Sequence, residues 1–291
     1  MATDVHNLTD RPLLLFALSL LGLWFWAGVG RWLLRRRFSL EEEIREDFGF
    51  IIGASLTLLG LIIGFSFSMA TSRYDQRKNC EEAEANAIGT EYLRADLLPA
   101  ADAAKARALL KEYLDQRIQF YLAQDEPEAR RINNTTARSQ SALWSAVVAA
   151  TTAHPTPLAG LAVSGMNDVL NSQGYTQAAW WNRIPSAAWA LMATIAVVCN
   201  LLAGYGSRGA KSGAKLLPVL PLVISIAFML IADIDTPRFG IIRVKPQNLM
   251  SLVESMRSLS AGSLQERFAV FLMDQSSQFS AGPGSPMKAG G

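Results

Sequence analysis

Four stretches of the sequence are almost free of charged residues, and each is long enough to cross a lipid bilayer as a helix. They are residues 12–34, 48–70, 184–204 and 216–234, and together they contain two charged side chains, Arg31 and Asp233. A hydrocarbon core of about 30 Å requires roughly 20 helical residues. The sequence therefore predicts a membrane protein with four spans that pair as two hairpins.

Residues 71–183, between the two hairpins, have the balanced charge of a soluble domain, with 12 basic and 13 acidic side chains. Apolar residues at three- and four-residue spacing predict helices, and no segment alternates as a strand would. Because no proline occurs between residues 48 and 98, the second span is expected to continue as a helix beyond the membrane. A later helix, which begins at residue 158, is expected to stop near Gly174.

The predicted fold class is all-α, with four transmembrane helices in two hairpins and a helical extramembrane domain between the second and third spans. The chain then divides into a first hairpin (1–70), the helical domain (71–183) and a second hairpin (184–236). A turn and a helix are expected over 237–275. Residues 276–291 are rich in Ser, Gly and Pro and are expected to form a disordered tail.

Composition argues against several classes of function. The net charge is +2 and no basic tract lies outside the membrane flanks, so nucleic-acid binding is not expected. Two cysteines and two isolated histidines provide neither a disulfide framework nor a metal cluster. No phosphate-binding loop, nucleophile elbow or zinc-protease motif is present. The sequence thus predicts neither an enzyme nor a cofactor site.

Small residues gather on one side of the second span. Two G-x-x-x-G units, Gly49 with Gly53 and Gly60 with Gly64, fall within about 100° of one another on a helical wheel. In lipid, small residues allow close approach of two helix backbones, so one interpretation is packing against a neighbouring span. The other is that this face, or its edge, lines a pore formed by copies of the same helix.

Three segments of the sequence are similar to known membrane proteins. Residues 64–78, with Gly64 and Phe65 followed by Arg73 and a long polar helix, resemble the second span of bestrophins. Residues 235–240 and 246–249 are similar to the bestrophin segment after the fourth span, although Arg238 interrupts its Pro-Phe-Gly turn. Residues 48–50 together with 84–95 resemble the bacterial bestrophin-like membrane family. The resemblance covers about residues 45–260 in layout.

This resemblance implies a pentameric ion channel in a lipid bilayer, whose partners are copies of itself and the small ions it passes. By its motif, the neck of the pore is expected at Thr57, Leu61 and Phe65, although Thr57 stands where a bulky apolar residue is expected. An apolar ring of this kind gates by dewetting and passes small anions. Beyond the neck, three cations are either mouth residues that concentrate anions or anchors at the membrane flank. These cations are Arg73, Arg77 and Lys78.

Other interpretations stay open at this point. The protein is alternatively a non-conducting scaffold or sensor whose helical domain binds a partner. Asp233 and Asp235 are candidate metal ligands, but hard cations require six or more oxygen ligands, and a turn or helix-capping role is favoured. The resemblance implies the bacterial inner membrane with the large domain in the cytosol. Basic residues do not decide the orientation, because both sides of the predicted spans carry them equally.

Overall fold

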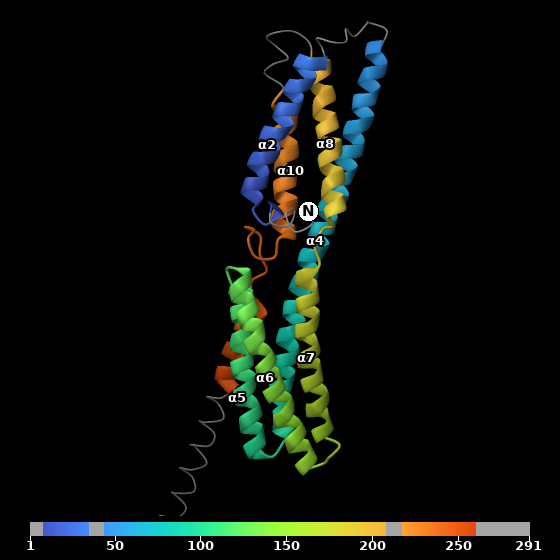
Figure 1. The fold of residues 1–291 in the computed structure, drawn as a ribbon. Helices are drawn as coiled ribbons and strands as arrows, with labels where there is room; N and C mark the ends of the chain where they lie inside the picture. The colour runs from blue at the N-terminus through green and yellow to red at the C-terminus, as the bar shows by residue number, and fades with distance from the viewer. Residues whose placement is uncertain (1–7, 35–43, 208–216, 260–291) are drawn as a thin grey trace, which may run out of the picture.

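The computed structural model describes residues 8–34, 44–207 and 217–259, and this part of the chain contains helices and no strands (Figure 1). The all-α prediction is therefore confirmed for the described residues. The predicted tail at 276–291 and most of the two hairpin turns lie outside them. In chain order the elements are α2 (Pro12–Val29), the π-helix η1 (Gly30–Leu34), α4 (Ile44–Arg94), the 3-10 helix η2 (Ala95–Leu97), α5 (Ala100–Leu122), α6 (Glu126–Ala153), α7 (Ala159–Trp181), α8 (Ser186–Gly206), α10 (Val219–Asp235) and a helix over 247–259.

The molecule is elongated, and α4 runs along most of its length (Figure 1). At 1.5 Å per residue, its 51 residues make a rod of about 75 Å. One half of this rod packs against α8 and α10, which also contact α2, and the other half packs against α7 and α5, which also contact α6. Each half has its own apolar core, so α4 is the element that joins a predicted membrane half to an extramembrane half.

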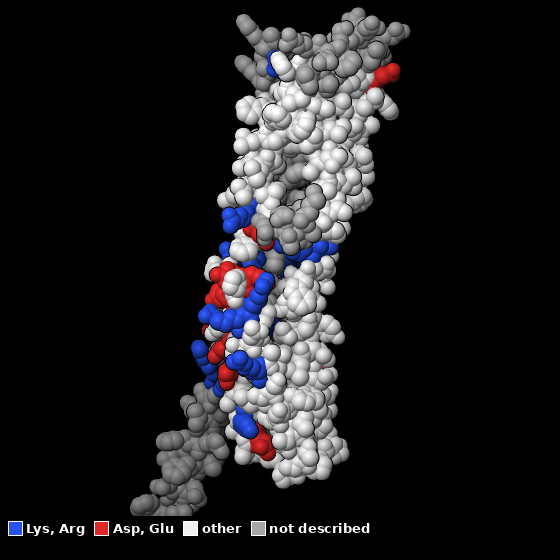
Figure 2. All heavy atoms as spheres, in the orientation of Figure 1, with Lys and Arg blue, Asp and Glu red and all other residues white. Residues whose placement is uncertain are grey.

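On the face shown in Figure 2, charged side chains gather in one half of the molecule, and the other half shows them only at its far end. Around α2, α8 and the first half of α4 the surface is almost free of charge, whereas a band of basic and acidic side chains begins where α10 ends. Because a charged group is costly in the hydrocarbon core of a bilayer, this band marks the boundary of the membrane. The chain is a membrane protein with apolar helices.

Three helical segments of the described chain are long and apolar enough to cross a membrane, namely Pro12–Trp32, Asp47–Leu97 and Ala159–Gly206. They contain the first, second and third predicted spans. The fourth predicted span corresponds to α10, which has 17 helical residues and packs against α2 and α4. A count of four spans therefore remains a prediction.

Proline and aspartate set several helix boundaries. Pro12 occupies the first turn of α2 and Pro185 precedes the first residue of α8, positions at which no backbone N–H is required. Asp125 caps α6 by accepting a hydrogen bond from the backbone N–H of Glu128 at 2.7 Å. The expected break near Gly174 was wrong, because α7 continues as one helix to Trp181.

Candidate functional site

One face of α4 is exposed along both halves of the molecule. The predicted neck residues Thr57, Leu61 and Phe65 all lie on it, and the side chains of Leu61 and Phe65 are 53% and 64% exposed. At about 100° per residue, the face occupies an arc of roughly 100°. We call it the α4 face; its exposed residues from Thr57 to Asn86 are Thr57, Leu58, Leu61, Phe65, Ser68, Ser72, Asp75, Gln76, Asn79, Ala83 and Asn86.

The apolar segment of α4 is packed far less than that of the other spans. Only 6% of its most apolar window is buried inside the protomer, compared with 22% for the segment containing α2 and 33% for the segment containing α8. An uncovered span must contact lipid or another protein chain. The α4 face therefore has room for a partner along its whole length.

The glycines of the second span lie beside the α4 face and contact no other helix of the protomer. A methyl group added at Gly49, Gly53, Gly60 or Gly64 would meet nothing within 4 Å. Among the described residues, these glycines therefore pack against no other span of the protomer, and packing against a neighbouring span of another copy stays a prediction. A neighbouring copy of the chain can still contact this glycine surface.

Close helix approach inside the protomer occurs instead at two glycines that sequence reasoning did not select. A side chain at Gly30 would collide with the carbonyl oxygen of Leu201, and one at Gly204 would collide with that of Ala27. These reciprocal contacts let the end of α2 and η1 pack directly on α8. Neither glycine belongs to a G-x-x-x-G unit, so their helix contacts are only weakly predictable from the sequence.

Beyond the apolar segment, the α4 face is polar and carries one acidic side chain, Asp75. Residues 67–79 line a shallow groove that includes Asp75. On the arc itself the other side chains from Ser68 to Asn86 are hydroxyls, amides and Ala83, and Asp75 falls at the same angle as Thr57. A helix face in water ordinarily carries more charge, so this face has the sparsely charged polar character of a surface that lines a wet passage or contacts another chain.

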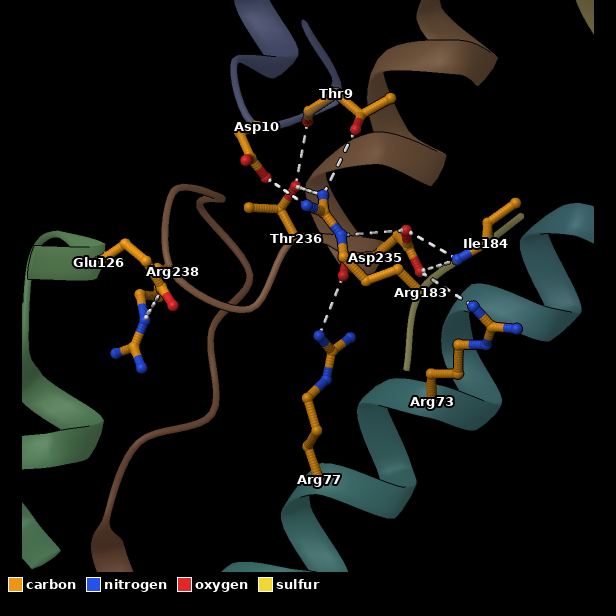
Figure 3. Close-up of polar contacts among 10 residues, drawn as sticks. All are labelled: Thr9, Asp10, Arg73, Arg77, Glu126, Arg183, Ile184, Asp235, Thr236 and Arg238. Carbon is orange, nitrogen blue, oxygen red and sulfur yellow. Dashed lines mark hydrogen bonds and ion pairs between the residues drawn. The ribbon is translucent and has the colours of Figure 1, made fainter. Parts of the chain in front are cut away.

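Arg77 is buried inside the protomer, whereas a cation at a pore mouth would be exposed to solvent. Its side chain is 1% exposed and points to the last turn of α10 (Figure 3). Its two terminal nitrogens donate hydrogen bonds to the carbonyl oxygens of Asp235 and Ile234, both at 2.9 Å. The last carbonyls of a helix lack partners within the helix, so Arg77 stabilises the end of α10. Burial lowers the pKa of Arg77 to about 10, which leaves it charged at neutral pH.

Asp235 joins three segments of the chain just beside Arg77. Both of its carboxylate oxygens accept a hydrogen bond from the backbone N–H of Ile184 at 3.2 Å. Arg73 and Arg183 each lie 3.8 Å from this carboxylate. We call Arg73, Arg77, Arg183, Asp235 and Thr236 the junction cluster, and Figure 3 shows it between the end of α10, the start of α8 and α4.

Arg183 extends the junction cluster to the N-terminal segment. Its guanidinium lies 2.7 Å from a carboxylate oxygen of Asp10 and 3.2 Å from the hydroxyl of Thr236. The hydroxyl of Thr236 in turn donates a hydrogen bond to the carbonyl oxygen of Thr9 at 3.0 Å. The cluster therefore fixes the boundary between the two halves of the molecule, where Figure 2 shows the charged band.

The two candidate metal ligands have structural partners. The carboxylate of Asp233 accepts hydrogen bonds from the backbone N–H groups of Ile241 and Ile242 at 2.7 and 2.9 Å, and Asp235 is surrounded by arginines. The described residues contain no group of three or more His, Cys, Asp or Glu side chains that could hold a metal ion. These contacts correspond to the turn and capping role rather than to a site for a hard cation.

The other two predicted mouth cations differ in environment. Arg73 is partly covered, because its guanidinium lies near Asp235 and donates to the sulfur of Met69 at 3.4 Å. Lys78 is exposed on α4 and directly follows Arg77 of the junction cluster in sequence. Only Lys78 among the three is placed to meet ions in solution without rearrangement, and its role at a mouth remains a prediction.

Arg238 has a role that the sequence did not suggest. Its guanidinium lies over the rings of Phe120 and Trp180, at 4.7 and 4.5 Å from their centres, and donates to the carbonyl oxygen of Phe120 at 3.1 Å. It also pairs with Glu126 at 3.2 Å. Arg238, which interrupts the turn motif, therefore attaches the segment after α10 to α5, α6 and α7.

Glu91 is a buried carboxyl group in the extramembrane half. Its side chain is 1% exposed, and one carboxylate oxygen has no hydrogen-bond partner within the described structure. The carboxylate and Arg94 fill the space that Gly165 of α7 leaves by lacking a side chain. Burial raises the pKa of Glu91 from 4.5 to about 8, although the charge of Arg94 opposes this.

Glu91 is expected to make stability fall as the pH rises from about 4.5 toward about 8. Over this range the folded state holds a proton that the unfolded state releases, so protonation favours folding at the lower pH. The thermal midpoint of the full-length protein in detergent should therefore decrease more steeply with pH than that of Glu91→Gln. If the thermal midpoints of the parent protein and Glu91→Gln change equally with pH, the raised pKa of Glu91 is contradicted. Other titrating groups contribute equally to both proteins.

Comparison with solved structures identifies the fold of this protein. A variant of the bestrophin homologue from Klebsiella pneumoniae is similar over 83% of this chain and 98% of its own, with a TM-score of 0.55 and 16% identity. The same homologue solved by zinc phasing gives a TM-score of 0.54 at 16% identity over 82% and 97% of the two chains. A membrane protein variant gives 0.57 at 15% identity over 81% and 98%. The fold is that of a bestrophin.

The family follows from the sequence itself. The sequence model of the bestrophin-like domain family matches residues 16–249, which is most of the chain. This protein belongs to the bestrophin-like domain family. No curated protein matched it. The family is known for anion channels rather than for enzymes, and membership supports a channel function in general.

Proposed function

We propose that this protein is one subunit of an oligomeric ion channel that passes small anions, and that the α4 face lines its pore. The observation that carries the proposal is the unpartnered α4 face, which continues from Thr57 in the apolar half to Asn86 in the extramembrane half. A lipid-facing surface would end at the membrane boundary. A surface that is apolar inside the membrane and polar outside it, with Asp75 as its one acidic side chain, suits a continuous passage between copies.

The proposed neck is formed by Leu61 and Phe65, with Thr57 one turn further into the membrane half. Copies of these exposed side chains around one axis would form an apolar constriction, at which wetting controls conduction. The face carries no carboxylate between Thr57 and Ser72, and the exposed Lys78 lies beyond it. We propose that weak hydration of the ion, rather than a ring of charge, sets the preference for anions.

The assembly and its location are part of the same proposal. By resemblance the oligomer is a pentamer in the bacterial inner membrane, with α5, α6, α7 and both termini in the cytosol. The glycines Gly49, Gly53, Gly60 and Gly64 lie beside the α4 face and would then allow neighbouring α4 helices to approach closely.

Recordings from the purified protein in planar bilayers test this function. We expect discrete single-channel steps whose reversal potential, in a gradient of potassium chloride, moves toward the chloride equilibrium potential. A reversal potential at the potassium value would contradict the anion preference alone. Oligomers that are intact in the same preparation but electrically silent would favour the scaffold or sensor alternative and contradict the channel.

A further inference from the structure

A groove lies at the membrane boundary next to the junction cluster, whose Arg183 pairs with the groove residue Asp10. It has a volume of about 460 Å³ and lies between the first turn of α2, the last turns of α10 and the loop over 237–242. Its apolar walls include Leu13, Leu230 and Ile242. The volume falls within the roughly 300–1,000 Å³ of pockets that hold organic ligands.

Large apolar side chains stand exposed around this groove. Ile241 is 85% exposed and Leu13 is 71% exposed, and Phe239 is exposed to 47%. Such side chains are costly in water, and a cluster of them marks a surface that contacts lipid or another molecule. We call Phe239, Ile241 and Ile242 the loop tip.

The loop tip is held in place by its backbone. Asp233 accepts hydrogen bonds from the N–H groups of both Ile241 and Ile242, and a side chain at Gly240 would collide with the carbonyl oxygen of Asp233. The loop is therefore built to present two adjacent isoleucines outward instead of folding them onto α10. All of the contacts that hold the loop in this position lie among the described residues.

Exposed cations flank the groove and the loop tip. Arg11 lines the groove, and Arg243 and Lys245 follow the loop tip in sequence. Arg243 donates to the carbonyl oxygen of Gly240 at 2.7 Å, which holds its guanidinium against the loop. None of the three is ion-paired within the part of the chain that the structure describes. The acidic members of the groove are engaged, Asp10 by Arg183 and Asp233 by the loop N–H groups.

We propose that this groove binds an anionic phospholipid. An acyl chain occupies the apolar groove and covers the loop tip, and Arg11, Arg243 and Lys245 bind the headgroup phosphate. The position at the start of the charged band in Figure 2 is where the headgroups of a bilayer would lie. Apolar side chains next to exposed cations are the combination that anionic lipid surfaces attract. The proposal does not depend on conduction.

A fluorescent label at Ile241 tests the acyl-chain contact. A bimane would be attached to Ile241→Cys in full-length protein with Cys80→Ser and Cys199→Ala, reconstituted in phosphatidylcholine vesicles with a small fraction of phosphatidylglycerol. We expect phosphatidylglycerol with brominated acyl chains to quench this label strongly. The same label at Tyr175→Cys, which is 69% exposed on α7 in the extramembrane half, should be quenched little. Equal quenching at both positions would overturn the proposal.

The headgroup contribution is tested by exchanging which lipid is brominated. Brominated phosphatidylglycerol should quench the label at Ile241→Cys severalfold more, per mole, than brominated phosphatidylcholine. Adding Arg11→Gln, Arg243→Gln and Lys245→Gln should remove this preference, whereas Lys105→Gln, Lys111→Gln and Arg131→Gln on the extramembrane helices should preserve it. Equal quenching by both lipids in the parent protein would overturn the headgroup assignment. If neither brominated lipid quenches the label appreciably, and unlabelled Ile241→Cys protein forms disulfides between copies, the groove binds a second copy of the chain and the lipid proposal is overturned.

Discussion

Arg117→Met is expected to destabilise the protein by about 3–5 kcal/mol, because it leaves a buried carboxylate without its counter-charge. Arg117 and Glu84 form an ion pair in the extramembrane core, and both side chains are fully buried. The carboxylate of Glu84 also accepts hydrogen bonds from the hydroxyls of Tyr121 and Thr176 at 3.4 and 3.2 Å. These neutral donors do not replace a guanidinium. The thermal midpoint of the full-length protein in detergent should fall by on the order of 10 °C.

Two comparisons separate this effect from a general loss of arginine. Arg130 pairs with Glu126 at 3.8 Å on the surface of α6, where its side chain is 76% exposed. Arg130→Met should change the stability by about 1 kcal/mol or less. The double variant Glu84→Gln with Arg117→Met should be more stable than Arg117→Met alone, since no charge is then left unpaired. If Arg117→Met and Arg130→Met lose equal amounts of stability, the claim that the buried pair of Arg117 and Glu84 is critical for folding is contradicted.

Phe65→Ala is expected to raise the conductance, or the fraction of time spent open, severalfold. Phe65 is 64% exposed in the protomer and lies on the α4 face with Leu61 one turn before it. In the proposed pore its ring narrows and dries the passage, and alanine would permit wetting at a lower energetic cost. Leu61→Ala should act in the same direction. Single-channel recordings in planar bilayers measure both variants.

Phe25 provides a matched control for Phe65. It is also 64% exposed and lies in a predicted span, but on α2 rather than on the α4 face. Phe25→Ala should leave the single-channel conductance at the value of the parent protein. If Phe65→Ala leaves the conductance unchanged, or if Phe25→Ala changes it as much, the neck assignment fails.

Much of the fold could be predicted from the sequence because its signals are local. Apolar stretches of span length, the absence of proline from residue 48 to residue 98, and Pro185 before α8 all act within a few residues. The break expected near Gly174 was wrong because a single glycine in a helix costs only about 1 kcal/mol, which packing of α7 against α4 exceeds. Local propensity therefore gives way where a long helix is packed along its length.

The candidate site was less predictable, because its contacts join residues far apart in the chain. Arg77 follows the second span as a membrane-flank cation would, yet its partners are carbonyl oxygens more than 150 residues away. Arg117 and Glu84 are likewise 33 residues apart on different helices. Helical spacing does predict which residues share the α4 face with Leu61, since that depends on the period of one helix. It does not say what the face contacts.

The position of the α4 face in the assembled protein is the most direct test of this account. An experimental structure of the purified oligomer in lipid nanodiscs would show which residues of α4 face the symmetry axis. We predict a closed ring of copies with α4 innermost and Leu61 and Phe65 turned toward the axis. A ring with α4 on the lipid-exposed rim, or a protein that is a single protomer in the bilayer, would contradict the proposed pore.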